Sequence, residues 1–167
     1  MAHSTLRKMT ATHPRPHAMA TPSISRGKHS LILVVLSALG FLDALFLSYE
    51  HFMGLIPPCI IQFKCDLVTT SSYSVIFSIP VPYLGLAYYL TLFIGSLVFL
   101  ENKNSVQVLK FLTIVSGIGF FGSLYFTYIQ GFVLNAWCLY CIFSAIISTL
   151  FFVTTVFIKK KISKASY

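Results

Sequence analysis

The chain carries little charge for its length, and acidic residues are the scarcest of all. Only 10% of its 167 residues are charged and only 4 are Asp or Glu, whereas 56% are hydrophobic. Soluble domains usually contain about 25% charged and 45–50% apolar residues. A water-soluble core does not need such an apolar excess, so we expect most of the surplus to face lipid.

Several common functional motifs are also missing. The sequence contains no internal repeat, no glycine-rich phosphate loop and no zinc motif that includes histidine. Its net charge of +8 comes from 12 basic residues that lie in the flanks of the apolar runs. Proteins that bind nucleic acid concentrate such charge on one folded face. The distribution therefore argues against nucleic acid as a partner.

Four long apolar runs predict the fold class. A helix rises about 1.5 Å per residue, so about 20 residues cross roughly 30 Å of hydrocarbon. We therefore predict an all-α integral membrane protein, a bundle of four transmembrane helices. The expected spans are residues 31–52, 79–100, 108–130 and 136–158.

The basic residues also predict an orientation, because loops rich in Lys and Arg stay in the cytoplasm. Eleven of the 12 fall on one side of the four spans, and the exception is Lys64. We expect a multi-pass protein of the inner (cytoplasmic) membrane, with both termini cytoplasmic and the connections 53–78 and 131–135 outside. Residues 1–30 are predicted to be a disordered basic tail and residues 159–167 a second basic tail.

Two cysteine pairs lie on the outer side of the predicted bundle. Cys138 and Cys141 form a C-x-x-C at the outer start of the fourth span, and Cys59 and Cys65 lie in the long first loop. At a helix N-terminus, free amide groups and the helix dipole favour thiolate over thiol. Thiol/disulfide exchange passes through mixed disulfides. A loop pair beside a membrane-anchored pair therefore predicts a redox relay.

Other interpretations of the cysteines remain open at this point. Both pairs could be structural disulfides of a non-enzymatic membrane protein, or the four cysteines could be unrelated buried thiols. A metal site would more typically show C-x-x-C twice, and we expect none. A transporter is a further alternative, but apart from Asp43 the spans have few polar residues. The C-x-x-C lies at the start of a helix, and a second cysteine pair lies on the same side of the membrane. Together these two features favour the redox relay.

Short motifs extend from about Gly40 through Cys141. They are Gly40-Phe41-Leu42-Asp43 with Tyr49, Cys59 with Cys65-Asp66-x-Val68, Ser71-x-Tyr73-Ser74, Ile79-Pro80 with Gly85, and Cys138-x-x-Cys141. Their types and order resemble the bacterial vitamin K epoxide reductase family. The resemblance implies a four-helix bundle around a quinone, covered by an extracytoplasmic lid loop that contains a short helix.

The resemblance also implies an activity. It implies an oxidoreductase that acts on protein thiols, with membrane ubiquinone or menaquinone as acceptor. Electrons would pass from a partner through Cys59 and Cys65 to Cys138 and Cys141, and then to the quinone. No thioredoxin-like domain follows the fourth span, so the implied partner is a separate periplasmic or extracytoplasmic thioredoxin-fold disulfide oxidase. Membrane lipid is the other expected partner.

Quinone contacts are expected at four positions close to the cysteines. Thr70 and Ser71 could hydrogen-bond a quinone carbonyl or cap a helix. Tyr73 and Trp137 could stack on its ring or anchor the chain at the membrane interface. Asp43 lies in the outer half of the first span, where a carboxylate is costly unless it is paired, hydrated or protonated. It could relay protons to a quinone or make a structural hydrogen bond.

Membrane-impermeant thiol reagents test the predicted orientation. After reduction, all four cysteines should react from outside the cell and none from the cytoplasm, because the basic residues lie on the opposite side. Mass spectrometry of labelled intact cells and inverted vesicles measures each site. Reaction of Cys138 from the cytoplasm while Cys59 reacts from outside would break the topology and the relay with it.

Overall fold

The computed structural model describes residues 23–59, 63–101 and 106–165. Most of the tail predicted at residues 1–30 lies outside the described residues. Its last part is helical, because the first helix begins at Ser23 rather than at residue 31. Helix formation is cooperative, so the long apolar helix extends into the polar residues that precede it.

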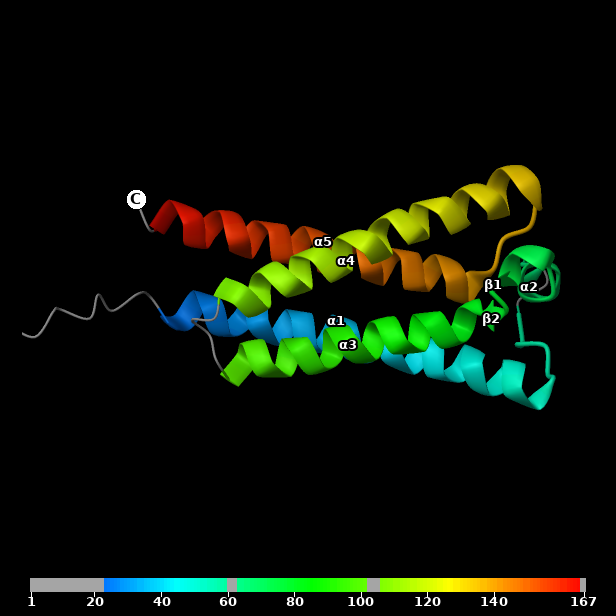
Figure 1. The fold of residues 1–167 in the computed structure, drawn as a ribbon, viewed down its shortest axis with the longest axis horizontal. Helices are drawn as coiled ribbons and strands as arrows, with labels where there is room; N and C mark the ends of the chain where they lie inside the picture. Colours follow the sequence, from blue (N-terminus) through cyan, green and yellow to red (C-terminus); the bar gives the residue numbers. More distant parts are fainter. Residues whose placement is uncertain (1–22, 60–62, 102–105, 166–167) are drawn as a thin grey trace, which may run out of the picture.

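Four long helices form the molecule. They are α1 (Ser23–Met53), α3 (Val81–Glu101), α4 (Val106–Tyr128) and α5 (Leu139–Ala165), and α4 continues into the π-helical turn η2 (Ile129–Val133). Each contains a segment that is long and apolar enough to cross a membrane. Figure 1 shows them side by side lengthwise, with the start of α1 and the end of α5 at the same end. The predicted four-helix membrane fold is therefore confirmed.

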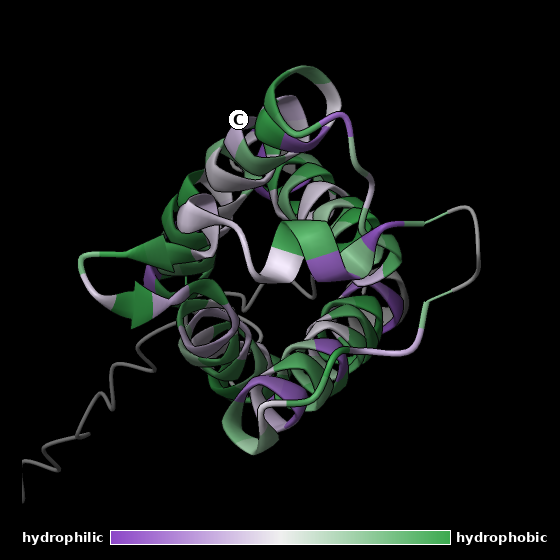
Figure 2. Ribbon diagram, turned by 90° about the vertical axis from the view of Figure 1, so that its right-hand side faces the viewer, coloured by the Kyte–Doolittle hydropathy of each residue, from purple (hydrophilic) through white to green (hydrophobic). Residues whose placement is uncertain are grey.

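The described residues of the connection between α1 and α3, 54–59 and 63–80, form a lid at the other end of the bundle. The lid contains α2 (Cys65–Thr69), the 3-10 turn η1 (Ser72–Ser74) and the paired strands β1 (Val75–Ile76) and β2 (Ile79–Pro80). Figure 2 looks onto this end and shows α2 crossing in front of the space between the four helices. The expected short helix of the lid is thus α2. The strand at residues 79–80 also means that the second long helix begins at Val81, not at residue 79.

The outer faces of the helices are apolar, as a lipid-facing surface requires. Ile118 is 70% exposed and Phe121 is 68% exposed, both on α4. In water, a continuous exposed surface of this kind would promote aggregation. The inward faces form a core of buried side chains, in which α1 packs mainly on α3 and α5, and α4 packs mainly on α5.

Charge separates the two ends of the bundle. Among the described residues, Lys64 is the one lysine of the lid. The other described lysines lie at the end opposite the lid, near the start of α1, the start of α4 and the end of α5. They are Lys28, Lys110, Lys159, Lys160, Lys161 and Lys164.

Two adjacent tyrosines tie α3 to α5. The Tyr89 hydroxyl donates to the Ser144 carbonyl oxygen at 2.7 Å, and the hydroxyls of Tyr88 and Ser148 lie 2.9 Å apart. The Tyr89 ring lies so close to Gly40 of α1 that a β-carbon at that position would collide with it. Small residues allow membrane helices to approach closely. Gly40 therefore admits the ring that joins α3 to α5.

Replacement of Gly40 by Ala should lower thermal stability, because the new methyl group displaces the Tyr89 ring. Overpacking of this kind costs about 1–3 kcal/mol. Thermal unfolding in detergent, followed by circular dichroism, measures the effect. Gly122→Ala is the matched control, since a β-carbon at Gly122 meets nothing within 4 Å. Equal melting temperatures for the two variants would contradict the close contact.

Candidate active site

Both cysteine pairs lie at the lid end of the bundle. Cys59 and Cys65 form a disulfide with their Cα atoms 6.2 Å apart, whereas Cys138 and Cys141 are free thiols. Cys65 and Cys138 are buried, and Cys59 and Cys141 are partly exposed. The lid pair is therefore oxidised and the C-x-x-C pair reduced.

A backbone hydrogen bond brings the two buried cysteines together. The Lys64 N–H donates to the Trp137 carbonyl oxygen at 3.1 Å. Lys64 directly precedes Cys65, and Trp137 directly precedes Cys138. Covalent geometry then limits the separation of the two cysteine Cα atoms to about 11 Å. The inner lid cysteine and the first cysteine of the motif are neighbours.

A second hydrogen bond attaches the outer part of the lid. The Tyr140 hydroxyl donates to the Pro58 carbonyl oxygen at 2.9 Å, and Pro58 directly precedes Cys59. The Tyr140 ring also packs against Phe46 of α1, with ring centroids 5.3 Å apart. A residue between the two cysteines of the motif thus holds both the lid and α1.

The start of α5 separates the environments of Cys138 and Cys141. The helix begins at Leu139, three residues after the predicted span start at 136, so Cys138 precedes the helix and Cys141 lies in its first turn. The hydrogen bond with the Cys141 side chain lowers the pKa of the Cys138 thiol and outweighs burial, which raises it. Helix N-terminal amide groups favour thiolate in the same way. Cys138 is therefore well placed to be a nucleophile.

Gln130 holds the backbone of Cys138 in place. Its side chain is 4% exposed, and its Oε1 accepts the Cys138 N–H at 3.0 Å. Its own carbonyl oxygen accepts the Ala136 N–H at 3.0 Å. Gln130 belongs to the π-helical turn η2, a type of distortion that is frequent at functional sites. Gln130 was not predicted from the sequence, in which a lone amide at the end of an apolar span was the one available signal.

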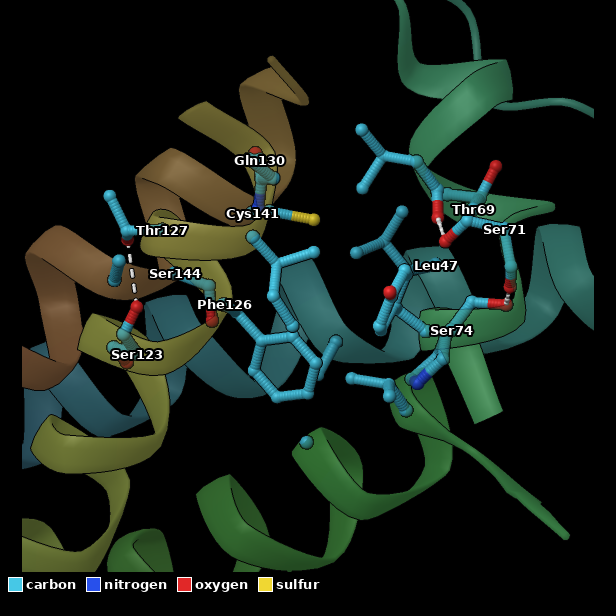
Figure 3. Close-up of a pocket in the computed structure, with 18 of the residues that line it drawn as sticks. Leu47, Thr69, Ser71, Ser74, Ser123, Phe126, Thr127, Gln130, Cys141 and Ser144 are labelled. Atoms are coloured by element: carbon cyan, nitrogen blue, oxygen red, sulfur yellow. Dashed lines mark hydrogen bonds between the residues drawn. The ribbon is translucent and has the colours of Figure 1, made fainter. Parts of the chain in front are cut away.

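A cavity of about 140 Å³ lies beneath the lid, with a wall that includes residues of all four long helices. Figure 3 shows the Cys141 sulfur pointing into it from α5, while Thr69, Ser71 and Ser74 face it from the lid. Most of the remaining wall is apolar, as at Leu47 and Phe126. An apolar cavity of roughly 150 Å³ takes a benzene molecule. This cavity can therefore admit one six-membered ring.

Two of the four expected quinone contacts line this cavity. Ser71 and Tyr73 both belong to its wall. The Ser71 hydroxyl donates to the Val68 carbonyl oxygen at 2.8 Å, so its oxygen keeps the capacity to accept a further hydrogen bond.

The other two expected contacts lie away from the cavity. The Thr70 hydroxyl is exposed and donates to the Asp66 carbonyl oxygen at 2.6 Å. Trp137 is 43% exposed, and its ring lies against Gly131. Successive residues of a helical turn point in different directions, so Thr69 faces the cavity and Thr70 does not.

A four-helix membrane bundle, in which a disulfide and a dithiol meet beside a ring-sized cavity, has the parts of a membrane thiol oxidoreductase. The sequence model of the vitamin K epoxide reductase family matches residues 31–156, which is 126 of the 167 residues. The chain therefore belongs to this family, whose members are membrane thiol oxidoreductases that in general use quinones. A search of curated proteins found no match.

Replacement of Gln130 by Leu tests whether its side-chain amide holds the backbone of Cys138. The change leaves the buried Cys138 N–H without an acceptor, which costs about 1–3 kcal/mol. We expect a lower melting temperature and a changed alkylation rate of Cys138, measured by mass spectrometry. Gln107→Leu is the control, because Gln107 is exposed at the other end of α4. The same result for both variants in both measurements would contradict the role of Gln130.

Proposed function

We propose that the protein oxidises the thiols of a separate, extracytoplasmic thioredoxin-fold protein and passes the electrons to a membrane quinone. The observation that carries this proposal is an oxidised cysteine pair that lies beside a reduced pair, one member of which, Cys141, lines a ring-sized cavity. When bound, a quinone supplies the acceptor for two electrons and two protons and leaves as the quinol. The residues of the chain then have three tasks: to receive electrons, to exchange disulfides and to hold the acceptor.

Exposure supports Cys59 as the residue that meets the partner protein. Cys59 is partly exposed, whereas Cys65 is 1% exposed. A partner thiolate attacks the Cys59 sulfur, the lid disulfide breaks, and Cys65 leaves as a thiolate. The second thiol of the partner then attacks the partner's sulfur in the mixed disulfide and releases the Cys59 thiolate. The partner is thereby oxidised, and the lid pair is reduced.

Proximity supports the next exchange, between Cys65 and Cys138. The backbone bond of Lys64 to Trp137 keeps them adjacent, although a mixed disulfide needs Cα atoms about 4.4–6.8 Å apart. The Cys65 thiolate attacks Cys138 of the oxidised motif and releases the Cys141 thiolate. Cys59 then resolves the link and restores the lid disulfide. The oxidised lid beside reduced Cys138 and Cys141 corresponds to the stage that follows.

The residues of the cavity fit a quinone ring. Binding sites for such ligands are mostly apolar and have a few polar groups that fix orientation. Leu47 and Phe126 supply apolar wall, and Ser71 and Ser144 supply hydroxyl groups on different sides. The Cys141 sulfur points into the same space, so Cys141 is the proposed contact between the cysteines and the acceptor.

Charge supports an extracytoplasmic lid. The end opposite the lid carries all described lysines except Lys64, and positive loops remain in the cytoplasm. The cysteines then lie in the compartment where disulfides form and persist. This supports the proposal that the protein lies in the inner membrane with both termini in the cytoplasm.

Free thiols at Cys138 and Cys141 disfavour the alternative of a non-enzymatic protein with two structural disulfides. A reduced pair does not staple a structure. Cys141 of this pair instead lines a cavity, where oxidation of the pair can be coupled to a ligand.

Quinone reduction by the purified protein tests the proposal. With a reduced thioredoxin-fold oxidase and a short-chain ubiquinone or menaquinone, one quinol should form for each partner disulfide. Cys141→Ala should abolish quinol formation, because no thiol remains at the cavity, and should leave Cys138 able to form a mixed disulfide with a lid cysteine. Full quinone reduction by Cys141→Ala would contradict the role assigned to Cys141. A wild-type protein that reduces neither ubiquinone nor menaquinone would contradict the proposed function.

The order of transfer has its own test in two further variants. With Cys65→Ala, the partner should accumulate as a mixed disulfide on Cys59, because the lid lacks its second thiol. With Cys59→Ala, a link from Cys65 to Cys138 should dominate instead. Non-reducing peptide mapping by mass spectrometry identifies each adduct. A partner found chiefly on Cys65 would reverse the proposed order.

A further inference from the structure

Asp43 is the residue of the cavity that the steps above leave unused. It lies on α1 and lines the same cavity as Cys141. Its Oδ2 is buried and has no hydrogen-bond partner. Burial of an unpaired carboxylate is costly, and ionisable residues within membrane helices commonly mark proton or ligand pathways. The position therefore calls for a chemical explanation.

The surroundings of Asp43 contain thiols and phenols but no cation. Among the described residues that line the cavity, the titratable groups are Asp43, Tyr73 of the lid and Cys141 of α5, and none is Lys, Arg or His. The charge of Asp43 also acts on Tyr89 of α3 and on Cys138. No counter-ion in this wall compensates the carboxylate.

The other polar side chains near the cavity floor are already engaged. The Tyr89 hydroxyl donates to the Ser144 carbonyl oxygen at 2.7 Å and lies 2.9 Å from the Ser144 hydroxyl. The Thr127 hydroxyl donates to the Ser123 carbonyl oxygen at 2.7 Å. Asp43 thus offers the one buried side-chain oxygen without a partner among the described residues of the wall.

We propose that Asp43 accepts the thiol proton of Cys141 when the C-x-x-C pair is oxidised, and delivers it to the bound acceptor. This inference rests on the proposed quinone reaction and adds the path of one proton. Asp43 and Cys141 line the same cavity, and a general base takes a proton either directly or through one water.

The step balances with Cys138 as thiolate and Cys141 as thiol. One S–S bond forms between them, one S–H bond breaks, and two electrons pass to the quinone. The proton of Cys141 reaches one quinone oxygen through Asp43. The second proton comes from the aqueous phase, which had received the proton of Cys138 when that thiol ionised.

The kinetic test compares Asp43→Asn, Asp43→Glu and the wild-type protein. General base catalysis contributes about 10²–10⁴-fold, so the Asn variant should lower kcat at least about 10-fold and leave KM for a short-chain ubiquinone nearly unchanged. Wild-type kcat should fall as the pH falls, because the base must be ionised. The Asn variant should lose the part of this acidic limb that comes from Asp43 and keep the part that comes from protonation of Cys138. The Glu variant should restore the lost part at a shifted pH. Glu50→Gln, seven residues further along α1 and outside the cavity wall, should match wild type.

A second readout needs no quinone. In reduced, quinone-depleted protein, the rates at which iodoacetamide alkylates Cys138 and Cys141 are measured against pH. An ionised Asp43 opposes a second negative charge nearby. The Asn variant should therefore alkylate at lower pH than wild type, even though it reduces quinone more slowly. If Asp43 had only a structural role, Asp43→Asn would not make quinone reduction slower while it makes the thiols react at lower pH.

The outcomes separate this inference from the proposed function. If Asp43→Asn has the same kcat, pH profile and alkylation profiles as the wild-type protein, the proposed role of Asp43 is overturned, and the proposed function still stands. A wild-type protein that exchanges disulfides with its partner but reduces no quinone would overturn the proposed acceptor, while the alkylation profiles still report on Asp43. If the Asn variant does not fold, Asp43→Glu decides, because an acidic limb that does not move would overturn the inference.

Discussion

A single backbone hydrogen bond, from the N–H of Lys64 to the carbonyl oxygen of Trp137, joins the two halves of the redox site. Cys65 and Cys138 each follow one end of this bond, so it converts two segments more than seventy residues apart in the chain into neighbours. The bond uses main-chain atoms and therefore survives changes of side chain. The contact of Tyr140 with Pro58 reinforces it from the outer side. Together they set the position of the lid over the cavity.

The bilayer explains why most hydroxyl groups of the spans are hydrogen-bonded within their own helix. Within hydrocarbon, backbone groups must be satisfied inside the segment, and the hydroxyls of the spans largely follow the same rule. Thr91, Ser96 and Thr149 each donate to the carbonyl oxygen four residues earlier. Such hydroxyls offer little to a ligand. The unpartnered carboxyl of Asp43, in a wall with a free thiol, is therefore distinctive.

Burial distinguishes the four cysteines. Cys65 and Cys138 are closed off from solvent, which would protect the proposed exchange between them from other thiols, whereas Cys59 is partly exposed. Exchange requires an approach along the S–S axis, and a static lid would restrict it. The hydrogen bonds of Lys64 to Trp137 and of Tyr140 to Pro58 attach the lid to the bundle. An attachment of this kind suits the proposed alternation of the lid between a partner protein and the bundle.

Hydropathy and spacing predicted the four membrane helices and the grouping of the cysteines into two pairs, because the length of an apolar run depends on local composition. The lid with its short helix was expected only from the resemblance to the family. Only the tertiary structure decided which neighbours meet. In the structure, Thr69 lines the cavity and Thr70 and Trp137 do not. Gln130, which was not predicted, accepts the Cys138 N–H with its side-chain oxygen. The tertiary structure also moved the start of the last helix to Leu139. These outcomes depend on packing between distant segments and on the direction of each side chain, which a local pattern does not contain.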